Sequence, residues 1–398
     1  MFLDDSMGEL VDISGTDPRT GVPWEHQAFI PRPLPSTSPT LLPATYRAVA
    51  EARAALAALD ATARQLPNPQ LLRGLSLRRE AQSTSALEGT YAPLDEVLTA
   101  DEEATQTGEL TEVLNYVTMA DAGFTWIQEG RPLTLDLLQS LQGILMRGTP
   151  LEPESGRLRT TQVVIGRRDV PAPVSAPIHA ARFVPSPPGD QLVGGVSDLV
   201  HWLGTDHDAE IDPVVQSAMA HYQFETLHPF RDGNGRLGRF LIVITLLTTG
   251  VLTEPTLTVS PWFEARRTEY YDALLAVSTQ GDWDGFIGFF AGSLHGAADS
   301  TRDQMLALVA VQEELKDLVR SSPLRADSAI SLVDLAVANP SFTVRRVERE
   351  LGLSYGRSNK LVAQLVELGV LQPVGADSTS RRFIAPRVLD VLLHRRVG

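Results

Sequence analysis

The stretch HPFRDGNGRLGR, residues 228–239, combines a histidine, an acid, three arginines and a Gly-Asn-Gly turn. Upstream of it, Asp212 and Pro213 are typical of a helix start, because aspartate caps the first amides and proline fits the first helical position. Gly233 and Gly235 interrupt this helical pattern, and the following RLGRFLIVITLLTTG resumes it as a strongly apolar helix. The stretch is therefore predicted to join two helices, with the glycine turn at the entrance of a buried one.

The turn has the features of a phosphate-binding site. A helix N-terminus presents unpaired N–H groups and the positive end of the helix dipole, and glycines let a phosphate approach the backbone closely. The residues that would form this anion nest are Gly233, Asn234 and Gly235. Arg236 and Arg239 are three positions apart, so both guanidinium groups lie on one side of the first helical turn. Together these features predict a polyphosphate ligand.

Asp232 and His228 extend the prediction to metal and proton chemistry. A carboxylate beside phosphates is the usual way to hold Mg²⁺, because a cation must separate the two negative groups. His228 is the one nearby group that titrates near neutral pH, so it can take a proton from a nucleophile. Each residue has a structural alternative, namely a helix-capping histidine, a simple turn and arginines that solvate a helix. Their combined spacing favours a nucleotide site, and Phe230 is interpreted as an aromatic anchor of the loop.

Helical periodicity dominates the chain and predicts a mostly α protein. Between residues 158 and 184 the short β-branched pieces TTQVVIG and HAARFVP, separated by prolines, predict a small hairpin. Residues 1–40 are rich in Pro, Ser and Thr and show no sustained period, so they are predicted to be an irregular lead-in. The predicted helices cover residues 44–66, 75–89, 109–127, 134–146, 190–204, 212–227, 235–249, 262–278, 282–296 and 301–320.

Composition and charge exclude several classes of protein. The absence of cysteine excludes disulfides, thiolate metal sites and cysteine nucleophiles. The first residues lack the basic and apolar segments of a signal peptide, and no apolar run reaches the roughly 20 residues of a membrane helix, so we expect a soluble cytoplasmic protein with no membrane partner. The net charge is −15, yet residues 341–398 hold ten Lys or Arg against five Asp or Glu. The tail is therefore predicted to be a separate module, and the acidic remainder is not expected to bind nucleic acid.

The stretch 228–239 resembles the motif of the Fic family, H-x-F-x-[DE]-G-N-G-R-x-x-R, at every defined position. The resemblance extends to the helices from about 110, the hairpin near VVIG and the downstream YYDALLAVSTQGDWDGFIGFF; just before the latter, Arg266-Arg267 replaces the Asn-Arg of many relatives. It implies a mostly α fold with a Fic-type helical core and a small β-hairpin flap. The implied division is a lead-in (1–40), an N-terminal helical region with an inhibitory helix (41–108), the Fic core (109–300), a connecting helix (301–325) and a winged helix-turn-helix-like domain (326–398).

Fic proteins typically transfer the AMP of ATP to a Ser, Thr or Tyr hydroxyl of a protein and release pyrophosphate. The resemblance implies that His228 is the general base and that Asp232 holds Mg²⁺ between the α- and β-phosphates. It assigns the nest to charge stabilisation and the arginine pair to the β- and γ-phosphates. Val163, Val164 and Ile165 are similar to the family's flap, which holds a target by strand addition. Backbone pairing of this kind does not read the target's sequence, so the target stays unidentified and self-modification stays open.

Residues 84–89, TSALEG, resemble the family's inhibitory signature, [ST]-x-x-x-E-[GN]. The defined positions are Thr84, Glu88 and Gly89. A glutamate at a helix end that reaches Arg239 forms a charge-assisted bond, and the same guanidinium then cannot hold a γ-phosphate well. The structural alternative is a solvated helix end stopped by glycine. We expect autoinhibition within one chain, and because the same loop removes AMP in some relatives, a reverse activity is also open.

The tail resembles a winged helix-turn-helix. A helix, the segment TVRRVERELGL, a tight SYGR turn, the helical SNKLVAQLVELG and the strand-like SRRFIAP follow one another. In DNA binders the second helix enters the major groove, and here that helix carries Arg357, Asn359 and Lys360. The alternative is a small module for docking or homodimer contacts. The rival to the transferase is therefore a DNA-binding regulator whose Fic core senses nucleotide or modifies the regulator.

Overall fold

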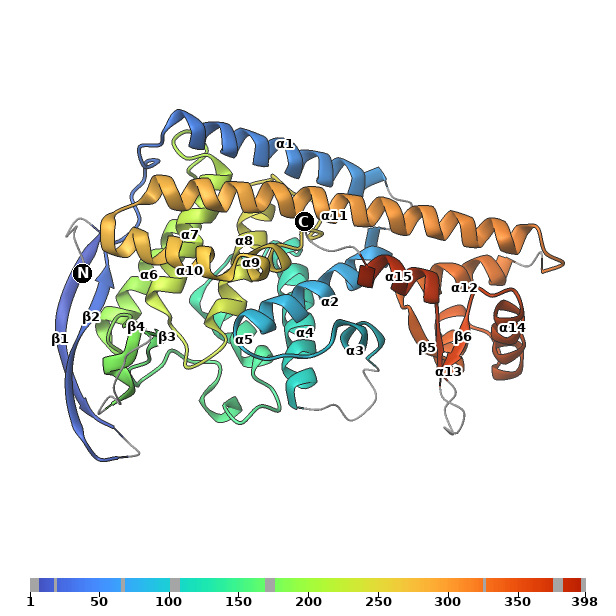
Figure 1. Ribbon diagram of the computed structural model, residues 1–398, viewed down its shortest axis with the longest axis horizontal. Coiled ribbons are helices and arrows are strands. Elements are labelled where there is room, and N and C mark those ends of the chain that lie inside the picture. Colours follow the sequence, from blue (N-terminus) through green and yellow to red (C-terminus); the bar gives the residue numbers. More distant parts are fainter. Residues whose placement is uncertain are drawn as a thin grey trace. The chain divides into compact units, whose positions relative to one another are not determined.

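A computed structural model describes residues 7–17, 20–65, 69–100, 108–168, 176–324, 327–374 and 382–394 (Figure 1). These residues are mostly helical with small antiparallel sheets, which confirms the predicted fold class. They form two compact units. The motif unit comprises Met1–Ala54, Thr118–Thr253 and Arg266–His295, and the tail unit comprises Ala55–Val117, Glu254–Ala265 and Gly296–Gly398. Among the described helices, none is long and apolar enough to cross a membrane.

The centre of the motif unit is the helix pair α7 (Pro213–Leu227) and α8 (Asn234–Thr248). Asp212 caps α7 as predicted, since its carboxylate accepts a hydrogen bond of 2.8 Å from the amide of Val214. Helix α8 is buried on all sides from Asn234 to Leu246, which explains its uninterrupted apolar sequence. The other regular helices of this unit include α5 (Leu135–Leu145), α6 (Asp190–Leu203) and α10 (Arg267–Gln280).

The predicted irregular lead-in is wrong: β1 (Gly8–Thr16) and β2 (Pro23–Pro31) form a nine-pair antiparallel hairpin. One face of it is apolar and packs on a buried cluster, because side chains alternate across a strand. The face carries Val11, Ile13, Trp24 and Ala28, and the cluster is formed by Ala176, Ile178, Ala181 and Val184. Pro, Ser and Thr elsewhere in the segment dilute this alternation in the sequence.

A second hairpin lies beside the first (Figure 1). Its strands are β3 (Ile165–Arg167) and β4 (Ala181–Phe183), which confirms the hairpin predicted for residues 158–184. The predicted flap strand is shorter than expected, because Val163 and Val164 precede β3 without regular structure. The amide of Phe29 donates to the carbonyl of Val184 at 2.9 Å, so the first hairpin is tied to the chain directly after β4.

The tail unit contains the C-terminal helices and a three-stranded antiparallel sheet of order β5-β7-β6. Its elements include α2 (Pro69–Leu87), α3 (Leu94–Thr99), α9 (Ser260–Ala265), α12 (Asp327–Ala338), β5 (Ser341–Thr343), α13 (Val344–Leu351), α14 (Tyr355–Glu367), β6 (Gln372–Val374), β7 (Arg382–Ile384) and α15 (Pro386–His394). This order is the one that the predicted winged helix-turn-helix requires, and its assignment as a DNA-binding fold stays a prediction.

Four predicted boundaries are wrong, and the first is the start of the helix predicted over 75–89, which begins at Pro69 as α2. The SYGR segment is not a turn between the helices but the start of α14, because Gly352 ends α13 in the left-handed conformation and Ser354 is already the N-cap of α14. Residues 262–278 do not form one helix, since the chain leaves helical geometry at Arg266 (φ −122°, ψ 35°) between α9 and α10. The helices predicted over 282–296 and 301–320 are one helix, α11 (Trp283–Arg320). Helices α1 (Pro43–Gln65), α4 (Gly108–Gln128) and α11 have residues in both units.

Candidate functional site

His228 stands at the C-cap of α7 in the left-handed conformation, with φ 48° and ψ 60°. Of the described residues other than glycine, it alone has a positive φ. Such a conformation costs an L-residue about 1 kcal/mol and is retained where surrounding contacts impose it, often at functional sites. Its amide donates to the carbonyl of Phe224 at 3.0 Å, and its imidazole Nδ1 lies 3.4 Å from the carbonyl oxygen of Glu225. The half-buried imidazole is thus held at the end of α7, as predicted.

Arg159 supports this turn from a distant part of the sequence. Its buried guanidinium donates to the carbonyl oxygens of His228 (2.8 Å), Leu227 (3.3 Å) and Ser186. Its own amide donates to the carbonyl of Pro229 at 3.0 Å. Burial lowers the pKa of Arg159 to about 10, so it remains a cation at neutral pH. One buried charge therefore satisfies the last carbonyls of α7 and fixes the backbone on both sides of His228.

The loop after His228 is closed by Asn234. The Oδ1 of Asn234 accepts from the amide of Phe230 at 2.8 Å, and its Nδ2 donates to the carbonyl of Phe230 at 2.9 Å. The Phe230 side chain is completely buried, which confirms its predicted role as an anchor. The asparagine side chain therefore holds the loop, and only its backbone amide is available for the predicted nest.

Gly233 and Asp232 shape the entrance to α8. Gly233 is the N-cap residue in the left-handed conformation (φ 80°), and a Cβ there would lie 2.8 Å from the Cδ2 atom of Leu145. Asp232 Oδ1 accepts from the amide of Gly233 at 2.6 Å and lies 3.4 Å from the guanidinium of Arg236. The carboxylate is 43% exposed. Gly235, the first residue of the helix predicted over 235–249, lies inside the first turn of α8.

Arg236 and Arg239 are both 1% exposed, which excludes the reading that they solvate a helix surface. Two buried guanidinium groups within the first two turns of one helix are costly unless anions or polar groups compensate them. Sequence reasoning missed another buried polar residue in this region, His221, whose ring nitrogens lie 3.0 Å from the carbonyl of Gly238 and 2.7 Å from the hydroxyl of Tyr270. Burial lowers the pKa of His221 to about 3, so this histidine is neutral and links α7 to α8 and α10.

The predicted flap is tied to the motif. Arg231 donates to the hydroxyl of Thr161 at 3.1 Å, and Gln162 donates to the carbonyl of Pro185 at 2.9 Å. Of the three predicted flap residues, Ile165 pairs with Phe183 across the hairpin, and Val164 is 38% exposed. The base of the flap is therefore joined to the motif loop by direct hydrogen bonds, from Arg231 to Thr161 and from Arg159 to the backbone carbonyl of His228, within one unit.

The predicted inhibitory segment belongs to the tail unit. Thr84 and Ser85 are completely buried in the last turn of α2, and the amide of Glu88 donates to the carbonyl of Ser85 at 3.0 Å. Glu88 and Gly89 follow the end of α2 and are exposed, and Gly89 has a φ of 94°. Glu88 thus stands at a helix end, and its bond to Arg239 stays a prediction.

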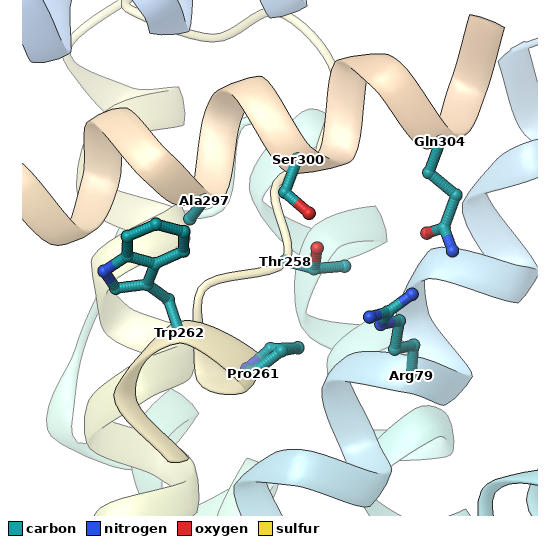
Figure 2. A pocket seen from close by; sticks show the side chains of 7 residues that line it. All are labelled: Arg79, Thr258, Pro261, Trp262, Ala297, Ser300 and Gln304. Atoms are coloured by element: carbon teal, nitrogen blue, oxygen red, sulfur yellow. The ribbon is translucent and has the colours of Figure 1, made fainter. Parts of the chain in front are cut away.

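A small cavity in the tail unit is lined by Arg79, Thr258, Pro261, Trp262, Ala297, Ser300 and Gln304 (Figure 2). Figure 2 shows the side chains of Arg79 and Gln304 directed toward one another. The cavity volume of about 10 Å³ is roughly the space of one water molecule. Burial lowers the pKa of Arg79, against the opposite effect of the Glu264 charge. The cavity is too small for a nucleotide, so it does not compete with the motif as a nucleotide site.

The described residues contain no cluster of three or more His, Cys, Asp or Glu side chains that would bind a metal on its own. A metal at the motif would therefore take few protein ligands, as Mg²⁺ does when it is bound together with phosphates.

Arg266 and Arg267, where many relatives carry Asn-Arg, stand at the start of α10, and the Arg267 guanidinium lies 5.9 Å from the ring centre of Tyr271.

Comparisons with known proteins agree with this geometry. The chain matches the model of the Fic/DOC family N-terminal segment over residues 46–125 and that of the Fic/DOC family over residues 132–246. It is similar to "Protein adenylyltransferase fic-1" of Caenorhabditis elegans, with 33% identity over 160 residues that cover 39% of this chain and 26% of that protein. It is also similar to "Protein adenylyltransferase Fic" of Drosophila virilis, with 30% identity over 156 residues that cover 39% and 27% of the two chains.

The matched part of this chain spans about a quarter of the length of these curated relatives. Among solved structures, a Fic family protein from Desulfovibrio desulfuricans G20 has the same fold, with a TM-score of 0.54 at 24% identity over 88% of this chain and 98% of that chain. Residues 132–246 are therefore a Fic/DOC family domain, and residues 46–125 match the N-terminal segment of that family.

Proposed function

We propose that the chain is a protein adenylyltransferase, which transfers AMP from ATP to a Ser, Thr or Tyr hydroxyl of a protein. The observation that carries this proposal is the complete motif on the α7–α8 turn, in which a strained histidine precedes two buried arginines on one helix. The printed names of the similar C. elegans and Drosophila proteins support the same activity. A fold that only bound nucleotide would need the arginines and the nest, but no histidine held at the cost of backbone strain.

In the proposed step, the acceptor oxygen attacks the α-phosphorus of ATP, the bond from that phosphorus to the bridging oxygen breaks, and pyrophosphate leaves. The acceptor proton passes to His228. If Nδ1 carries its proton toward the Glu225 carbonyl, Nε2 has the lone pair that a general base needs. The guanidinium of Arg159 donates to the backbone carbonyls of Leu227 and His228 and so keeps the imidazole in place. The first amides of α8 and its buried arginines stabilise the phosphate charge.

Asp232 fits the role of a Mg²⁺ ligand. Its Oδ1 is held by the Gly233 amide and Arg236, which leaves Oδ2 on a carboxylate that is 43% exposed. A single carboxylate oxygen is the usual protein contribution when Mg²⁺ is bound mainly by phosphates and water. When bound, the metal would neutralise charge on the α- and β-phosphates.

Transfer of label from ATP tests the proposal. With ATP labelled at the α-phosphate, we expect label on protein, and with ATP labelled at the γ-phosphate we expect none, since AMP rather than phosphate is transferred. The His228→Ala variant should lose about 10²–10⁴-fold in rate, the usual contribution of a general base. The exposed His201 on α6 provides the matched control, His201→Ala, which should keep the wild-type rate. Transfer that is unaffected by loss of His228 would overturn the mechanism.

We propose further that Glu88 restrains this activity within the same chain. The support is its place at the exposed end of α2, where a carboxylate is presented by a helix whose last turn is otherwise buried. The Glu88→Gly variant should label protein more strongly than wild type, and Glu129→Gly, an exposed glutamate just beyond α4, should not. Equal labelling by Glu88→Gly and wild type argues against autoinhibition. Pre-labelled protein that loses AMP only when Glu88 is present would support the reverse activity.

DNA binding by residues 326–398 is the second candidate function. It is favoured by the surface of α14, where Arg357, Asn359 and Lys360 are all exposed while Ser358, Leu361, Val362 and Leu365 are buried. A mobility-shift assay with genomic fragments should show binding that weakens with salt and is lost in an Arg357→Glu, Lys360→Glu variant. Unchanged mobility of every fragment at low salt argues against this function.

A further inference from the structure

The flap carries positive charge in an otherwise acidic chain. Of its described residues, 157–168 and 176–183 contain five arginines and no acidic side chain, whereas the whole protein has 49 acidic and 34 basic residues. Arg159 is buried under the α7 turn and Arg182 pairs with Asp272 of α10. Arg157, Arg167 and Arg168 are exposed. A protein with an acidic surface therefore presents cations at the place where a target segment would lie.

Two of these arginines stand on the strand that would receive a target. Arg167 is the last residue of β3 and Arg168 follows it. Strand β3 pairs with β4, and no other strand in the part of the chain that the structure describes pairs with it. An extended segment that adds to this open edge lies about 5 Å from β3, so its side chains come within reach of both guanidinium groups.

The backbone of the hairpin is fixed by hydrogen bonds and packing, so the side chains of Arg167 and Arg168 start from defined positions. The amide of Arg168 donates to the carbonyl of Ala180 at 2.8 Å, and its guanidinium donates to the carbonyl of His179 at 3.1 Å. At the other end, Thr161 bonds to Arg231 of the motif. The first hairpin packs on Ala181 and Val184 behind β4. The exposed charges thus sit on a rigid edge at a fixed distance from the proposed phosphate site.

We infer that the flap selects an acceptor protein whose extended segment carries Asp or Glu beside the acceptor hydroxyl. This inference rests on the proposed function, and it adds side-chain selection by Arg167 and Arg168 to backbone pairing that does not read sequence. Two opposite-charge pairs across neighbouring strands strengthen binding by about two- to thirtyfold, so reversal of both charges should weaken binding by about tenfold or more.

Binding without chemistry tests the inference directly. The probe is a fluorescent random copolymer of Glu and Tyr, compared with a copolymer of Lys and Tyr, and binding to the full-length His228→Ala variant is followed by anisotropy without ATP. We expect the Glu/Tyr copolymer to bind and the Lys/Tyr copolymer not to bind. Introducing Arg167→Glu with Arg168→Glu should weaken binding about tenfold, and Arg167→Gln with Arg168→Gln should weaken it less. The control pair is Arg47→Glu with Arg131→Glu, which reverses two exposed charges elsewhere in the motif unit and should have little effect.

Equal binding of the two copolymers, or an equal loss in the control pair, overturns the inference. A loss confined to Arg357→Glu with Lys360→Glu also overturns it, because the tail would then be the acidic-peptide site. Transfer of label from α-labelled ATP to the Glu/Tyr copolymer by the chain with His228 intact is measured separately. Charge-dependent binding without transfer counts against the adenylyltransferase while it supports the flap's preference, so the two failures are distinguishable.

Discussion

Arg159 is 69 positions from His228, and its side chain nevertheless fixes the backbone at the histidine. Replacing it by methionine keeps an unbranched side chain but leaves the carbonyls of Ser186, Leu227 and His228 without their donor. We expect Arg159→Met to lower the free energy of unfolding by about 3 kcal/mol, because charge-assisted hydrogen bonds to buried carbonyls are lost. Urea denaturation measures this loss. The exposed Arg157, which donates to one carbonyl, is the matched control, and Arg157→Met should change stability by less than about 0.5 kcal/mol.

His221 predicts a pH dependence of stability. Burial lowers its pKa to about 3, with the Arg239 charge acting in the same direction and the Gly238 hydrogen bond against it, while an unfolded imidazole titrates near 6.5. Below about pH 6.5 the unfolded chain takes up a proton that the folded chain excludes, so stability falls as pH falls. Between pH 7 and pH 5 this group should cost about 2 kcal/mol. The His221→Gln variant should lose that part of the slope, and identical slopes for the two proteins would contradict the assignment.

The two histidines show how far single residues were predictable. His228 is identified by its place in a motif with seven other defined positions, and its predicted place at the end of α7 is confirmed. His221 lies in the same stretch of sequence but belongs to no motif, and its role depends on Tyr270 of a later helix. The role of Arg159 was equally unpredictable from the sequence, since its partners are backbone carbonyls that any residue supplies.

At the scale of elements, α11 lacks a break that the sequence predicts. The break is expected between residues 296 and 301, yet one helix runs through them, and Gly296 within it marks a close approach of another segment. A Cβ at Gly296 would overlap the Trp262 indole, whereas one at Gly292 meets nothing within 4 Å. Patterns along one segment cannot reveal a neighbour that approaches from another part of the chain.

This contrast gives a prediction of opposite signs on one helix. Gly292→Ala should raise the free energy of unfolding by up to about 1 kcal/mol, because alanine loses less backbone entropy in a helix. Gly296→Ala should lower it by about 1–3 kcal/mol, since the indole must move. Thermal and urea unfolding of both variants beside wild type check the pair. Two stabilising substitutions would show that the indole packs differently from the structure.

Most elements of the motif unit were predictable because their patterns are local. The helices α5, α6, α7 and α8 begin and end within about one residue of the predicted positions. The hairpin β1–β2 was not predictable, because its strands are stabilised by packing on residues 176–184, far along the chain. The break between α9 and α10 at Arg266 was not predictable either, because no helix-breaking residue stands at this position in the sequence.

At the scale of the whole molecule, the motif and the tail belong to different compact units that interleave along the chain. The linear domain boundaries predicted from the sequence stay a prediction, since the composition of the chain does not change where it passes from one unit to the other. The net charge is equally a property of the whole, and its separation into an acidic body and a basic tail was visible in the sequence alone.

Nucleotide binding should therefore act on one unit. A non-hydrolysable ATP analogue with Mg²⁺ at 100 times its Kd should stabilise the site by about 2.7 kcal/mol. Hydrogen exchange should slow in α7, α8 and residues 159–165, with no change in α12–α14. In Asp232→Ala the effect of Mg²⁺ should disappear, whereas Asp208→Ala, an exposed aspartate before α7, should behave as wild type. Protection that appears first in the tail helices would contradict this assignment.

The left-handed backbone at His228 sets a conflict between folding and chemistry. Glycine accepts this conformation without penalty, so the fold by itself would gain from His228→Gly, by about 1 kcal/mol, while the proposed reaction would lose its base. A lineage under pressure for robustness alone would drift to glycine here. A histidine kept at this position despite the lost stability indicates selection for the proposed reaction, so the residue found here in a descendant of the chain indicates whether that descendant still performs it.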